Sequence, residues 1–116
     1  MTDSKLILND LKLGLLEKYS GSLNNVILFG SQASNKATEY SDYDILILLN
    51  EDYSRQDEDT ILDICYEIDL KYNILIDAHL LSTNELMTLR GKQPVFLNAI
   101  KNGMYAWRWM IKIDWI

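Results

Sequence analysis

The strongest constraint on the fold is an apolar run from Asp44 to Leu49, which holds no polar residue after its first position and stops at Asn50. So short a run, followed by turn-forming residues, is typical of a strand buried on both faces. A second run of this kind extends from Val26 to Phe29 and stops at Gly30, where a tight turn is expected. We therefore expect two buried strands, the second of them central in its sheet.

Helical periodicity surrounds these strands. Apolar residues recur at helical spacing from about Ser4 to Tyr19. Ser54 begins a capping-box pattern with Asp57, which opens a helix extending to about Tyr72. A further helix is expected from Pro94 until Gly103 ends it. The alternation predicts the α/β (α+β) class, with a small mixed β-sheet flanked by helices.

The remaining elements are shorter. A third strand is expected from Ile74 to Leu81, and short helices are expected at residues 31–36 and from Thr83. The last stretch, Met104 to Ile116, alternates well enough to form a final edge strand. The chain has no repeat and no linker, so we expect one domain over residues 1–116.

Composition excludes several classes of function. The formal net charge is −6, whereas proteins that grip nucleic acid use clustered Lys and Arg, so no direct nucleic-acid partner is expected. The opening residues MTDSKLILNDLK show neither a signal peptide nor a membrane span. The lone Cys65 cannot form an internal disulfide and is expected to be a buried structural thiol. These features indicate a cytoplasmic protein.

Three carboxylates on neighbouring strands carry the chemistry. Asp42 and Asp44 flank Tyr43, and side chains alternate between the two faces along a strand, so both aspartate side chains are expected on one side of the sheet. Asp77 joins them if the third strand pairs beside the second. Buried like charges repel and lose hydration unless a cation lies among them. Oxygen ligands suit Mg²⁺, which shares its coordination shell with substrate phosphates, so the sequence predicts a polyphosphate substrate.

The turn before these carboxylates suits the phosphates. Gly30 and Ser31 stand where a strand turns into a short helix, so backbone N–H groups there can face a phosphate. The Ser31 hydroxyl adds a further donor. Turn and carboxylates together predict a site that binds a triphosphate.

These residues also carry a family resemblance. Gly30-Ser31, then ten residues, then Asp42-Tyr43-Asp44 resembles the signature of the polymerase-beta-type nucleotidyltransferase superfamily, and Asp77 matches its third carboxylate. The stretches FGSQASNKATEYSDYDILILL and FLNAIKNGMYAW resemble the minimal nucleotidyltransferases, many of which are antitoxins encoded beside HEPN-domain toxins. The likeness covers roughly residues 5–107 and implies the nucleotidyltransferase fold.

The resemblance assigns roles to individual residues. It implies that Asp42 and Asp44 share two Mg²⁺ ions on the nucleotide phosphates and that Asp77 binds the ion beside the attacking hydroxyl. It places the nucleotide, expected to be ATP, at four residues: Gly30, Ser31, Gln32 and Lys36. Two positions depart from the family, because Gln32 replaces a frequent Arg and Asn35 replaces a usual Gly. Lys36 would then supply some of the missing positive charge.

The resemblance implies an adenylyltransferase that transfers AMP from ATP to a hydroxyl, by analogy a Tyr hydroxyl, of a partner HEPN toxin and so acts as its antitoxin. One alternative is a protein with weak or absent transfer activity that neutralises its partner by contact, which the loss of the Arg at Gln32 allows. Another is a small-molecule modifier of the aminoglycoside-nucleotidyltransferase kind, disfavoured because the chain has no acceptor-binding domain.

Each candidate residue also has a structural interpretation. Asp42 and Asp44 can form an ordinary turn before a strand, and Asp77 can lie on a strand edge exposed to water. His79 shares a face with Asp77 and lies either near the site or in a structural position. Tyr43 is expected to face away from the site, into packing. The aromatic-rich end from Tyr105 to Trp115 packs over the core or forms an interface with a partner or a second copy, giving a homo-oligomer.

Overall fold

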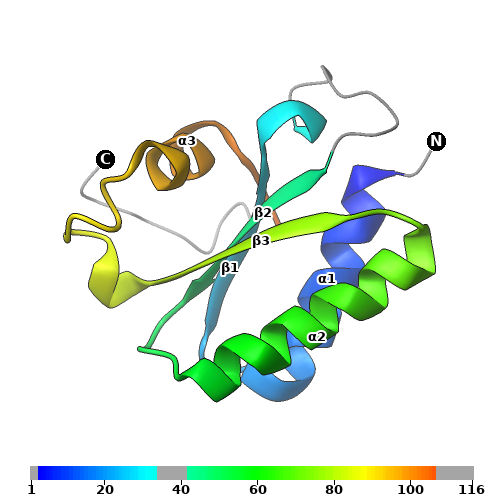
Figure 1. Ribbon diagram of the computed structural model, residues 1–116, viewed down its shortest axis with the longest axis horizontal. Coiled ribbons are helices and arrows are strands. Elements are labelled where there is room, and N and C mark those ends of the chain that lie inside the picture. The colour runs from blue at the N-terminus through cyan, green and yellow to red at the C-terminus, as the bar shows by residue number, and fades with distance from the viewer. Residues whose placement is uncertain (1–2, 34–41, 107–116) are drawn as a thin grey trace.

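The computed structural model describes residues 3–33 and 42–106, which form a four-stranded mixed sheet and its covering helices (Figure 1). The elements in chain order are α1 Ser4–Tyr19, β1 Leu23–Phe29, the 3-10 helix η1 Gly30–Gln32, β2 Tyr43–Leu49, α2 Arg55–Tyr72, β3 Ile76–Ser82, the 3-10 helix η2 Thr83–Glu85, α3 Pro94–Asn102 and β4 Met104–Tyr105. The strand order is β3-β2-β1-β4. β2 is parallel to β3, while β1 is antiparallel to both β2 and β4. The expected mixed sheet with an interior second strand is confirmed.

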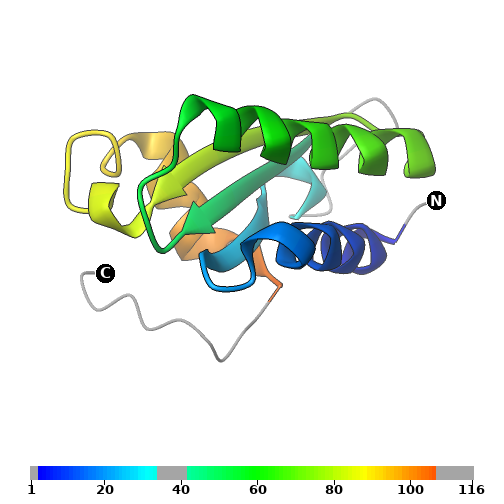
Figure 2. The ribbon, with the colours of Figure 1, turned by 90° about the horizontal axis from the view of Figure 1, so that it is seen from below.

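Helices cover both faces of this sheet, with α1 and α2 on one face and α3 on the other (Figure 2). Alternate residues of β2 divide between the faces. Tyr43, Ile45 and Ile47 pack with α1 and α2, whereas Leu46 and Leu48 pack with α3. Both sides of β2 are therefore apolar, which explains the continuous apolar run in its sequence.

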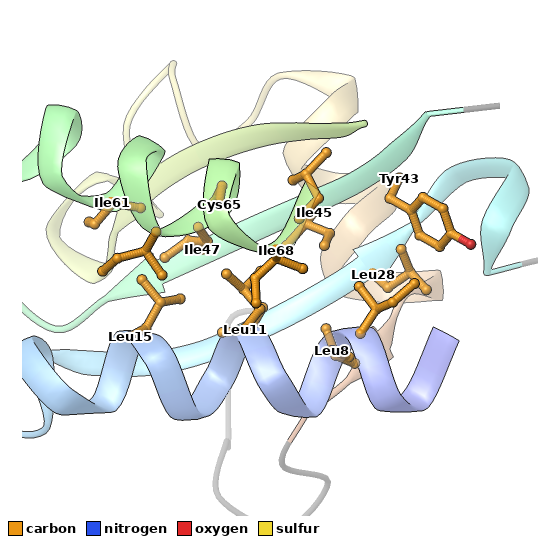
Figure 3. Close-up of a cluster of buried hydrophobic side chains, with 14 of the residues drawn as sticks. Leu8, Leu11, Leu15, Leu28, Tyr43, Ile45, Ile47, Ile61, Cys65 and Ile68 are labelled. Carbon is orange, nitrogen blue, oxygen red and sulfur yellow. The ribbon is translucent and has the colours of Figure 1, made fainter. Parts of the chain in front are cut away.

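The larger cluster of buried side chains lies between α1, α2 and the sheet (Figure 3). Leu11 and Leu15 of α1 meet Ile61, Cys65 and Ile68 of α2, the positions expected from helical spacing. Burial of these apolar side chains is the main contribution that stabilises such a fold.

Local capping fixes the ends of the helices. The capping box at the start of α2 is complete, since Asp57 N donates to Ser54 Oγ at 3.0 Å and Ser54 N donates to Asp57 Oδ2 at 2.9 Å. The helix ends at Asn73, which is left-handed at φ 54°. None of the helices in the described ranges is long and apolar enough to cross a membrane.

The strands differ from expectation at their ends. β1 begins at Leu23, three residues before the apolar run, because pairing with β2 continues past Val26 to the pair of Leu23 with Leu49, with an irregularity between Leu23 and Asn25. β3 begins at Ile76 and not at Ile74, because the chain still closes α2 at Ile74, whose N donates to the carbonyl oxygen of Asp69.

The short elements are also shorter than expected. Only Gly30–Gln32 is helical after β1, and Ala33 forms a turn; residues 34–36 of the expected helix lie outside the described residues. Met104–Tyr105 pairs with β1 at the sheet edge, as expected for this part of the final strand. The remainder of that strand, with its three Trp residues, lies outside the described residues.

Candidate active site

Two aspartates meet where β2 and β3 begin. Asp44 and Asp77 are direct partners in the register of this parallel pair, so their side chains leave the sheet on the same face. His79 lies two residues after Asp77 and shares that face. One ligand atom from each of these three residues lies within 4.8 Å of the other two. The sheet register therefore brings together residues that are more than thirty positions apart in the chain.

The turn after β1 contacts the same place. β1 is antiparallel to β2, and Phe29 pairs with Asp44, so Gly30 lies beside the aspartate. Gly30 has φ +74°, and a Cβ atom added there would lie 2.4 Å from Asp44 Oδ2. Only glycine fits both the backbone conformation and the space. The Gly30 turn is thus packed directly against the carboxylate, as the sequence motif predicts.

The electrostatics of Asp44 are unfavourable in the protein alone. Burial raises the pKa of the Asp44 carboxyl, and the negative charge of Asp77 raises it further. The nearby His79 opposes this shift, while Asp42 adds a smaller repulsion. A carboxylate of this kind is stabilised by a cation placed between it and its neighbour.

His79 is held by aromatic contacts. Its ring lies 5.5 Å from the centroid of Phe29 and 6.5 Å from that of Phe96, the latter edge-on. Its Nε2 lies 3.4 Å from Asp77 Oδ2. Sequence reasoning placed His79 on the correct face but did not count it among the site residues. The signal was its spacing of two from Asp77 within a strand.

The other expected site residues have different positions. Asp42 is exposed, one residue before β2, and is not part of the three-residue cluster, although its charge acts on Asp44. Ser31 and Gln32 lie in η1, half-buried beside Gly30. Lys36 lies outside the described residues.

Tyr43 faces away from the site, as expected. It is buried among the side chains of the α1 and α2 face of the sheet.

The cluster fits a divalent metal ion by its donor chemistry. Two carboxylates and an imidazole provide three ligand atoms close enough to share one ion. Asp77 is about half exposed and His79 about a quarter exposed, so an ion there would remain open to a further ligand. Such an arrangement can bind a metal and a polyphosphate together.

Comparison with known proteins gives consistent matches. The model of the family described as "Nucleotidyltransferase domain" matches residues 8–103. "Putative protein adenylyltransferase MJ0604" of Methanocaldococcus jannaschii is 35% identical over 89 residues, which are 77% of this chain and 83% of that protein. "Putative protein adenylyltransferase MJ0141" of the same organism is 37% identical over 70 residues, 60% of this chain and 71% of that protein.

A solved structure shares the fold. A chain in "Crystal structure of the toxin-antitoxin with AMP-PNP" superposes with a TM-score of 0.55 and 17% sequence identity, covering 85% of this chain and 72% of the other. The nucleotidyltransferase fold implied by the resemblance is thereby confirmed.

Proposed function

We propose that this chain, which belongs to the family of nucleotidyltransferase domains, is an Mg²⁺-dependent adenylyltransferase that transfers AMP from ATP to a hydroxyl group of a partner protein. The observation that carries the proposal is the meeting of Asp44 and Asp77 beside the Gly30 turn. The relatives named as protein adenylyltransferases support the choice of AMP and of a protein acceptor.

The acidic residues would hold the metal. Asp44 and Asp77 would be the central ligands, and Asp42, the exposed residue just before β2, would provide a further carboxylate. His79, whose Nε2 lies 3.4 Å from Asp77 Oδ2, would be a further ligand of the metal. When bound, Mg²⁺ ions at such a site lower the pKa of the acceptor hydroxyl and offset charge on the leaving pyrophosphate.

The chain's own groups would position the substrate. The Gly30 turn lies against Asp44 at the start of η1, so it would lie close to the phosphates of a bound nucleotide. Ser31 lies on the same turn and adds its hydroxyl. Asp77, the more exposed carboxylate, is on the side from which an acceptor hydroxyl can approach. Catalysis then depends on positioning and electrostatics.

The partner we propose is a HEPN-type toxin, with a Tyr hydroxyl as acceptor, so that the chain acts as an antitoxin. The similar fold within a toxin–antitoxin crystal structure supports this assignment.

A second function is neutralisation of that partner by binding alone. The observation that favours it is Gln32, which carries no positive charge on the turn where the family often has Arg. A site with one fewer cation near the phosphates stabilises the transition state less.

One experiment separates the two functions. The purified chain is incubated with Mg²⁺, a candidate HEPN-type toxin and ATP labelled at the α-phosphate. We expect label on the HEPN protein, and its loss when Asp77 is changed to Asn. Because Asp44 and Asp42 would still hold an Mg²⁺ ion on the phosphates, Asp77→Asn should retain part of the Mg²⁺-ATP affinity in calorimetric titration.

The matched control is Asp63→Asn, an exposed aspartate on α2 and on the other face of the sheet. It should transfer AMP at the wild-type rate. Equal transfer by Asp77→Asn and wild type would contradict the assignment of Asp77. Neutralisation without any label, kept in Asp44→Ala, would favour the binding function.

A further inference from the structure

A cavity of about 290 Å³ opens beside the candidate active site. It lies between the turn after β1 and the C-terminal half of α3, and is lined by Phe29, Gly30, Ala33, Asn98 and Asn102. Small-molecule sites usually measure about 300–1,000 Å³, so this cavity suits one part of a nucleotide.

The cavity lies directly beside the aspartates, because one residue borders both. Gly30 lines the cavity and also touches the Asp44 carboxylate. Phe29, the strand partner of Asp44, lines the same cavity with an apolar surface. A ligand whose phosphates lie at Gly30 and Asp44 therefore has the cavity within immediate reach for its nucleoside.

The polar lining comes from one face of α3. Asn98 and Asn102 are four residues apart, and Asn102 Nδ2 donates to Asn98 Oδ1 at 3.0 Å. Both side chains are exposed, so neither amide is taken up by packing between α3 and the sheet. Each amide carries two N–H donors and an oxygen acceptor, so the bond between them leaves further donor and acceptor capacity.

We propose that this cavity binds the nucleoside of the triphosphate and that Asn98 and Asn102 recognise its base. The inference rests on the proposed function, which supplies ATP as the nucleotide, and it adds the cavity and the two residues that would contact the base. Adenine presents an amino donor beside a ring-nitrogen acceptor, the pair that an Asn amide matches with its oxygen and its N–H group. On the corresponding N7 edge guanine presents two acceptors, so the amides would favour ATP over GTP if they contact that edge.

Direct binding tests this inference without any transfer step. The affinities of wild type, Asn98→Leu and Asn102→Leu for ATP and GTP are measured by calorimetry in Mg²⁺. Leu keeps the approximate size of Asn and removes its hydrogen bonds. We expect each variant to lose roughly three- to tenfold in ATP affinity, as for one neutral hydrogen bond, with a smaller change for GTP. The ratio of ATP to GTP affinity falls accordingly.

Gln93→Met is the matched control. Gln93 is an exposed amide at the opposite end of α3, makes no side-chain capping bond and does not line the cavity. It should bind ATP and GTP like wild type. Thermal unfolding of all variants shows whether α3 remains folded.

The results distinguish this inference from the proposed function. Unchanged ATP affinity and unchanged selectivity in both Leu variants would overturn the inference, while AMP transfer by wild type would leave the function intact. A wild type that prefers ATP through these amides and transfers no AMP would keep the inference and refute the enzymatic function. A wild type that binds no nucleotide would refute both.

Discussion

Gly30 and Asp44 are in direct contact across the β1–β2 pair: a Cβ atom on residue 30 would lie 2.4 Å from Asp44 Oδ2. This relationship joins the Gly30 turn and the candidate metal ligand into one structural unit. A change at either residue therefore affects the position of the other.

Gly30→Ala should damage both stability and activity. An L side chain at φ +74° is strained by roughly 1–2 kcal/mol, and the added methyl group also displaces the Asp44 carboxylate. We expect a loss of at least that size in urea unfolding and a strong fall in AMP transfer. Gly21→Ala is the control, since a Cβ atom there meets nothing within 4 Å. Similar behaviour of the two variants would contradict the contact.

Asp44→Asn should make the metal-free protein more stable at neutral pH. Burial and Asp77 raise the folded-state pKa of Asp44 above its usual value of 3.8, so the folded protein loses stability as pH rises through that pKa. The variant avoids this loss, and the difference should vanish below pH 3.8. Thermal unfolding of wild type and Asp44→Asn at several pH values, without metal, measures this difference in stability.

The same variant should lose AMP transfer by more than about 100-fold, because loss of even an outer partner of a metal ligand costs about 10- to 100-fold. Mg²⁺ should raise the unfolding temperature of wild type more than that of Asp44→Asn. The assignment of Asp44 would be refuted if Asp44→Asn were less stable than wild type without metal and if Mg²⁺ raised the unfolding temperature of both proteins equally.

Asp10 links α1 to the end of α2 and should give a pH-dependent contribution to stability. Lys71 Nζ donates to Asp10 Oδ2 at 2.7 Å, and the Tyr72 hydroxyl donates to the same oxygen. The bond from Lys71, then that from Tyr72, lowers the pKa of Asp10 below 3.8. The stabilisation from the Asp10 carboxylate is therefore fully present above pH 3.8 and is lost as the pH falls through the lowered pKa.

Asp10→Asn should accordingly be less stable than wild type in urea at pH 7, and equally stable once the wild-type carboxyl is protonated. Salt should reduce the difference at pH 7, because the pair lies at the surface. The control is Asp59→Asn, which changes an exposed aspartate of α2. Asp3→Asn is not suitable as a control because Asp3 caps α1. A difference that persists at low pH would indicate a role other than charge.

Cys65 should be unreactive in the folded protein. Burial, with a smaller effect of Asp69, raises the pKa of the thiol from 9.0 to about 12. The thiolate fraction at pH 8 is then about a thousandfold lower than for an ordinary thiol. Labelling with a disulfide reagent should be slow in buffer and fast in denaturant. Rapid labelling of the native protein would show that α2 opens easily.

The helices were the most predictable elements. α1 spans Ser4–Tyr19 as expected, and α2 begins after the expected capping box. Spacing of apolar residues and capping are local properties, so the sequence contains them directly. The strand ends were less predictable: the start of β1 depends on the pairing of Leu23 with Leu49, which are distant in the chain.

The candidate site was predictable in part. The pairing of Asp44 with Asp77 and the contact with Gly30 agree with the expected convergence. The place of His79 in the cluster and the exposed position of Asp42 did not follow from the sequence, since both depend on how far each side chain lies from a neighbouring strand.

Several expectations stay predictions. A single domain over residues 1–116, a cytoplasmic location, the binding of two Mg²⁺ ions and the nucleotide contacts of Gln32 and Lys36 are among them. The interface proposed for the Trp-rich end lies outside the described residues.

The sequence by itself determined which residues form helices, which strands are buried on both faces and which residue types carry the chemistry, because period, capping and composition are encoded in neighbouring positions. Tertiary structure alone decided that β2 and β3 align Asp44 with Asp77, that His79 joins them, and that Asn98 and Asn102 face a cavity at Gly30. Strand register and helix placement depend on packing between segments far apart in the chain, and no local pattern specifies them.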